Sequence, residues 1–140
     1  MSDWGRLCEA RITRIEFPSA TRDFVIGLRS ADAQTDFVMR AGHVHDLSVH
    51  GMRLLNLVDE LVMHTDFESP ELRELVQWLV TGEEQPYVAG ARPQVERQLS
   101  ELAAGGWQVC NVSAIYGAGM VIVAKSFSLE AVSIAPSVDR

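Results

Sequence analysis

Residues 69–82 read SPELRELVQWLVTG, and this segment carries the clearest start and stop signals for a helix. Ser69 stands where an N-cap is expected, Pro70 at the first helical position, and Glu71 at the positive end of the helix dipole. Apolar residues then recur at helical spacing, and Gly82 is suited to end the helix. The segment therefore predicts a helix over residues 70–80 that packs one apolar face against the protein.

The chain after this helix indicates a second helix and then a hairpin. Helical spacing resumes near Pro93 and stops at two consecutive glycines, so we expect a helix over residues 94–104. Residues 107–115 and 120–127 are β-rich runs joined by Tyr-Gly-Ala-Gly, whose glycines can supply the positive φ of a tight turn. The carboxyl-terminal part thus predicts a β-hairpin.

The chain before residue 69 indicates strands. Residues 10–17 alternate with a phase slip between Ile12 and Ile15, which predicts a strand with a bulge. Residues 24–29 and 35–40 alternate as a hairpin, and a polar break at Gly42 and His43 precedes a further edge strand around residues 47–49. Residues 52–64 satisfy both helical and alternating spacing, so a strand is preferred there and a helix stays open.

These elements define the expected fold class as α+β. A largely antiparallel sheet, made of the N-terminal strands and the C-terminal hairpin, carries two helices packed on one face. The 140 residues are 47% hydrophobic, which is enough for one globular domain over residues 1–140 with a short tail near 133–140.

Composition also bears on the compartment. No apolar run approaches the roughly 20 residues of a membrane span, and the amino terminus lacks the apolar region of a secretion signal. We therefore expect a cytoplasmic protein. Cys8 and Cys110, the two cysteines, are expected as free thiols that are both buried.

Catalytic motifs are missing, and the histidines offer the nearest approach to one. His43 and His45 are two apart and would share one face of a strand, but His50 has the wrong parity to complete a metal site. We therefore expect neither a metal nor a cofactor. The alternative is a small-molecule-binding domain or enzyme that uses residues 43–50 together with Asp59 and Glu60.

Charge is concentrated in one segment. Residues 59–84 hold eight acids and one arginine, while the flanking parts balance to zero, so the net charge of -7 lies here. One interpretation is a solvated helix face, and the other is an acidic docking surface that attracts a basic protein and repels nucleic acid and anionic membranes. Trp78 is either an aromatic anchor of that surface or part of the core. The candidate binding residues are Asp59, Glu60, Asp66, Glu68, Glu71, Glu74, Trp78, Glu83 and Glu84.

The layout resembles a known group of proteins. The small size, the excess of acids, the lack of a catalytic motif and a β-rich half that passes through LLNLVDEL (residues 54–61) into helices are similar to small bacterial immunity proteins of polymorphic-toxin and contact-dependent inhibition systems. The resemblance covers the whole chain as architecture and transfers no functional residue. It implies a cytoplasmic, non-catalytic protein that binds one cognate toxin domain, often a basic nuclease, and blocks its active site.

Overall fold

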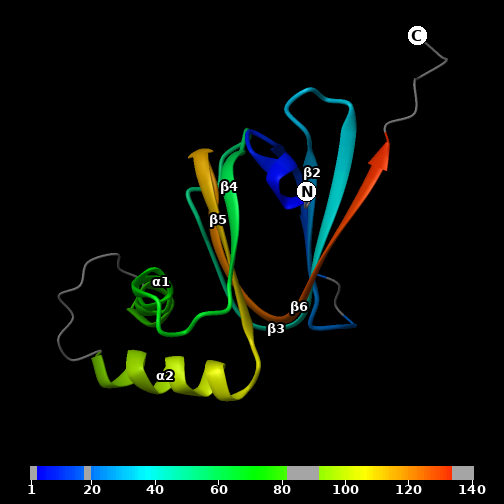
Figure 1. Ribbon diagram of the computed structural model, residues 1–140. Helices are drawn as coiled ribbons and strands as arrows, with labels where there is room; N and C mark the ends of the chain where they lie inside the picture. Colours follow the sequence, from blue (N-terminus) through cyan, green and yellow to red (C-terminus); the bar gives the residue numbers. More distant parts are fainter. Residues whose placement is uncertain (1–2, 18–19, 82–91, 134–140) are drawn as a thin grey trace, which may run out of the picture.

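The computed structural model describes residues 3–17, 20–81 and 92–133. Its strands pair antiparallel in the order β1-β2-β3-β6-β5-β4 and close into a barrel, with two α-helices on one side (Figure 1). The elements are η1 (Asp3–Leu7), β1 (Arg11–Glu16), β2 (Phe24–Arg29), β3 (Thr35–His50), β4 (Leu57–His64), α1 (Pro70–Thr81), α2 (Arg92–Ala104), β5 (Gln108–Tyr116) and β6 (Gly119–Ser133).

Mixed α and β structure and a largely antiparallel sheet are confirmed, and the sheet also closes into a barrel, which the sequence does not predict. The closing seam joins β1 to β4, where the Ile12 N–H donates to the Asn56 carbonyl at 2.9 Å and the Val58 N–H donates to the Ala10 carbonyl at 2.8 Å. Closure is possible because β3 and β6 are long enough to bend: β3 pairs with both β2 and β6, and β6 with both β3 and β5.

The predicted break at Gly42 and His43 is wrong, because β3 runs through it. His43 takes a left-handed φ of 52°, and the register with β6 shifts between Val44 and Asp46. A bulge of this kind bends a strand without ending its pairing. The polar residues therefore lie within β3, and the expected edge strand is the second half of β3.

Other local predictions hold. The register of β1 shifts between Ile12 and Arg14, which confirms the bulge, and residues 57–64 form a strand rather than a helix. The Ser69 hydroxyl accepts the Leu72 N–H at 3.2 Å, as an N-cap should, and α1 covers the predicted range. The C-terminal hairpin joins the sheet of the N-terminal strands through β3, although β6 extends to Ser133, beyond the predicted end at residue 127.

Two apolar clusters explain how the layers are held. The barrel interior contains side chains from all strands together with Leu7 of η1, a helix that lies at one end of the barrel (Figure 1). A second cluster lies outside the barrel, where Leu72 and Val76 of α1 and residues of α2 pack on Val109, Val121 and Val123 of the β5–β6 hairpin. Both faces of that hairpin are therefore buried, which explains its continuous apolar run, and the helices do pack on one face as predicted.

One burial prediction is wrong. Cys110 is buried in the barrel, but Cys8 is exposed in the turn after η1 and lines a recess with Trp4, Asp59 and Glu60. The apolar contact that pulls η1 onto the barrel is made by Leu7, so the next side chain points away from the core.

Candidate functional site

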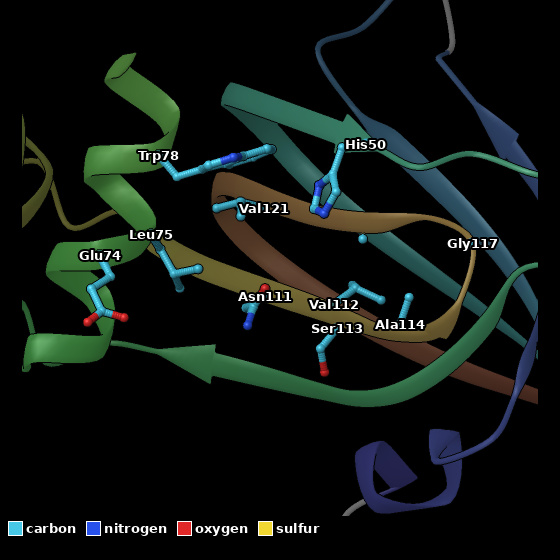
Figure 2. A pocket seen from close by; sticks show the side chains of 11 residues that line it. His50, Glu74, Leu75, Trp78, Asn111, Val112, Ser113, Ala114, Gly117 and Val121 are labelled. Carbon is cyan, nitrogen blue, oxygen red and sulfur yellow. The ribbon is translucent and has the colours of Figure 1, made fainter. Parts of the chain in front are cut away.

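A cleft of about 510 Å³ lies outside the barrel between α1 and the β5–β6 hairpin (Figure 2). Glu74, Leu75 and Trp78 come from α1, Asn111 and Ser113 from β5, and His50 from the end of β3. The volume is in the range of ligand-binding pockets, and its wall combines aromatic, apolar, amide, hydroxyl and carboxylate groups.

Helical spacing sets the α1 wall. Glu74 and Trp78 are four residues apart and therefore lie one helical turn apart on α1; Figure 2 shows the Trp78 ring extending toward His50. Leu72 and Val76 are fully buried on the face that meets the hairpin. Trp78 is half-buried: one part of its side chain packs against this second cluster, and it also lines the cleft.

An aromatic pair closes one end of the cleft. The centroids of the His50 and Trp78 rings are 4.9 Å apart, and their planes meet at 59°. His50 pairs in register with Gly119, and a Cβ atom at position 119 would come within 2.7 Å of the imidazole Cε1. Gly119 therefore provides the space in which the His50 ring lies.

Asn111 and Ser113 form the polar part of the floor. They alternate along β5 with Cys110 and Val112, which face the barrel interior, so both project outward toward α1. The Ser113 hydroxyl donates to the Glu60 carbonyl at 3.3 Å. Neither residue was named from the sequence, although the alternation of residues 109–113 carries the signal that would have found them.

Those carboxylates named from the sequence that the structure describes are all exposed. Within residues 3–17, 20–81 and 92–133 none of them forms an ion pair, whereas Glu16, Asp23, Asp36 and Glu96 all pair with arginines. Arg73 does not offset its neighbours, because it pairs with Glu96 of α2 and lowers the pKa of that carboxyl. The exposed set, called the acidic segment below, is Asp59, Glu60, Asp66, Glu68, Glu71 and Glu74. Glu83 and Glu84 lie outside the described residues.

Of the acidic segment, Glu74 lines the cleft and Glu60 lies on the strand next to β5. Glu60 is directly opposite Ser113 in the β4–β5 pairing, and directly opposed residues project to the same face of a sheet. Glu60 therefore projects to the same outer face of the sheet as Ser113, but it does not line the cleft. Asp59 and Glu60 also border the separate recess beside Trp4 and Cys8.

His64 at the end of β4 responds to both burial and charge. Burial lowers the pKa of His64 below its ordinary value of 6.5, and the negative charge of Glu71 opposes that shift. The first turn of α1 therefore lies close enough to β4 to couple the two side chains.

The histidine alternative does not assemble around one cavity. His43 lines a small recess of about 170 Å³ with Arg22, Trp107 and Lys125, and His45 packs against the Trp107 ring at 4.9 Å. His50 lies in the cleft, and Asp59 and Glu60 border a third recess. In the part of the chain that the structure describes, no group of three His, Cys, Asp or Glu side chains is placed to hold a metal ion.

Nucleophilic chemistry finds little support in this geometry. Ser113 and His50 both line the cleft, but the described contacts of the Ser113 hydroxyl lead to the Glu60 carbonyl and not to the imidazole. Burial raises the pKa of the Cys110 thiol to about 12, which keeps it protonated and inert. A nucleophile needs a base within hydrogen-bond reach, and the described hydrogen bonds of Ser113 provide none.

Fold and site together describe a closed antiparallel barrel with a helical layer and an external polar and aromatic cleft. No protein-family model, no curated protein and no solved structure matches the chain. Among the described residues, no helix is long and apolar enough to cross a membrane.

Proposed function

We propose that this chain is a non-catalytic protein-binding domain that docks a basic protein through the acidic segment and the adjoining cleft. The observation that carries the proposal is that, among the residues the structure describes, the exposed carboxylates of the acidic segment form no ion pair, while four acidic residues elsewhere are paired with arginine. Unpaired charge of one sign raises the local potential and speeds encounter with a partner of the opposite sign.

The arrangement also supplies an anchor for such a partner. Trp78 lies one helical turn from Glu74 on α1 and is only half-buried, and tryptophan is among the residues that contribute most to binding energy at interfaces. The barrel interior is filled by apolar side chains, so the surface features are the ones available for recognition. If the resemblance to bacterial immunity proteins holds, the partner is a toxin domain that this chain neutralises in the cytoplasm by covering its active site.

The test compares two charge variants with the same net charge. Glu60, Glu71 and Glu74 are changed to Gln in the first variant, and exposed glutamates outside the segment (Glu9, Glu101 and Glu130) are changed to Gln in the second. The wild-type chain and both variants are used to capture proteins from the source cells, and any partner retained by the wild type is purified for kinetics. We expect the first variant to lose the partner and the second to keep it.

The association and dissociation rates then distinguish long-range electrostatic attraction of the partner from direct contact with it. Association with the wild type should slow steeply as salt rises, because the Debye length is only about 8 Å at physiological ionic strength. The Gln substitutions should lower the association rate more than they raise the dissociation rate. Unfolding of each variant is measured in parallel, since Glu71 also favours the start of α1. Equal loss of binding in both variants, or a partner with an acidic contact surface, would overturn the proposal.

A further inference from the structure

We infer that the cleft beside α1 is a subsite for a guanidinium group, the planar cation of an arginine side chain. The proposed function supplies the source of that arginine, a basic protein partner, but the chemistry of the cleft can be tested without one. The inference depends on three features of the cleft: an uncompensated carboxylate, an adjacent aromatic pair, and an amide on the floor.

The charge of the lining selects a cation. Among the described residues that line the cleft, Glu74 bears the one carboxylate and no lysine or arginine is present. Glu74 makes no ion pair within the described chain, so its counter-ion has to come from solvent or from a ligand.

The aromatic pair favours a cation that can stack. Trp78 lines the same cleft one helical turn from Glu74. Tryptophan is the strongest aromatic partner of cations in proteins. His50 fixes the position of the indole from the other side, with 4.9 Å between ring centroids.

The floor favours a guanidinium over an ammonium group. The Asn111 side chain lines the cleft and makes no hydrogen bond with any other described residue. Its side-chain amide oxygen, Oδ1, is therefore available to accept a hydrogen bond. A guanidinium group has five N–H donors in one plane, so it can donate hydrogen bonds to a carboxylate and to an amide oxygen while it stacks on an aromatic ring. An ammonium group is a compact point charge that cannot stack in this way. Leu75 and Val121 provide apolar surface for the methylene stem.

The test is an NMR titration of the full chain with capped amino acids. N-acetyl-arginine amide should shift the Trp78 indole N–H and the Asn111 side-chain amide with saturation. N-acetyl-citrulline amide has the same shape without the charge, and it should bind at least about fivefold more weakly. N-acetyl-lysine amide should also bind more weakly than the arginine compound, and equal affinity of these two cations would overturn the preference for a planar group.

Two variants test whether binding of the arginine compound depends on the Glu74 carboxylate. Glu74→Gln should weaken binding of the arginine compound by about fivefold or more, and Glu101→Gln, which removes an exposed carboxylate on α2, should leave it unchanged. Equal binding of arginine and citrulline compounds, or shifts confined to another surface, would refute the subsite. If the arginine compound binds but no partner depends on the acidic segment, the proposed function fails and the subsite stands. If a partner binds through the acidic segment but the citrulline compound competes as well as the arginine compound, the subsite is refuted and the proposed function stands.

Discussion

Replacing Asn56 by Ala should destabilise the barrel strongly, because this side chain joins a loop to the hairpin at the closing seam. Asn56 is 5% exposed. Its Oδ1 accepts the Arg53 N–H at 3.0 Å and the Ala118 N–H at 2.8 Å, and its Nδ2 donates to the Arg53 carbonyl at 2.7 Å. Its own carbonyl accepts the Ile12 N–H across the seam.

The magnitude follows from these contacts. Each of the three side-chain hydrogen bonds contributes about 1 kcal/mol net, and leaving a buried N–H without a partner adds about 1–3 kcal/mol. Ala118 is 1% exposed, so its N–H has no access to water after the substitution. We expect the free energy of unfolding to fall by about 4 kcal/mol, a large part of the roughly 5–15 kcal/mol that holds a domain together.

Urea unfolding followed by circular dichroism measures the change. With a slope of about 2 kcal/mol per molar urea, the midpoint should fall by about 2 M. Asn111→Ala is the matched control, because that half-exposed asparagine makes no side-chain hydrogen bond with the described residues, and it should lose less than about 1 kcal/mol. If the two substitutions lower the midpoint equally, the hydrogen bonds of Asn56 are not what secures the seam.

Three further outcomes can be measured on the same protein. Ser69→Ala should lower stability by about 1 kcal/mol through loss of the N-cap of α1, and an unchanged thermal midpoint would contradict that role. A thiol reagent at pH 8 should modify exposed Cys8 in the native protein and reach Cys110 only on unfolding. Labelling of Cys110 before unfolding would refute its burial. Because burial raises the pKa of the Cys110 thiol from 9.0 to about 12, the contribution of this thiol to the free energy of unfolding is complete below pH 9 and is lost as the pH rises toward 12. Because burial lowers the pKa of His64, its neutral form stabilises the fold above pH 6.5, and that contribution is lost as the pH falls below 6.5. Glu71→Gln should lower the pKa of His64 further in an NMR titration, because the Glu71 charge raises it. A rise of that pKa would show that the two side chains are not coupled as described.

Local signals in the sequence predict local structure well in this chain. Ser69 and Pro70 start α1 because a cap and a fixed φ act within one turn, and Gly117 supports the hairpin with a φ of 85°. The phase slip near Ile12 likewise predicts a bulge that depends on consecutive residues alone.

Closure of the barrel and the composition of the cleft depend on contacts between distant residues, and no local pattern reports them. Arg11 meets Leu57 only after the whole sheet has curved, and the polar residues at His43 signal a break that pairing with β6 overrides. The cleft unites His50, Trp78 and Asn111 from three elements, so its existence follows from the fold and not from spacing. Exposure of the acidic residues could be predicted from their charge, whereas the absence of ion pairs at those the structure describes could be seen only in the fold.

The pairing of β3 with β6 also sets the order in which the protein can be completed during synthesis. β3 pairs along its length with the strand made after all the others, with Thr35 opposite Ser133. Until β6 leaves the ribosome, β3 has one unsatisfied row of backbone N–H and C=O groups and apolar side chains such as Phe37 and Met39 without their final neighbours. In the finished barrel β6 pairs with that row of β3, but in the nascent chain the row stays unpaired for most of the synthesis, and we expect that interval to be when the chain depends most on chaperones.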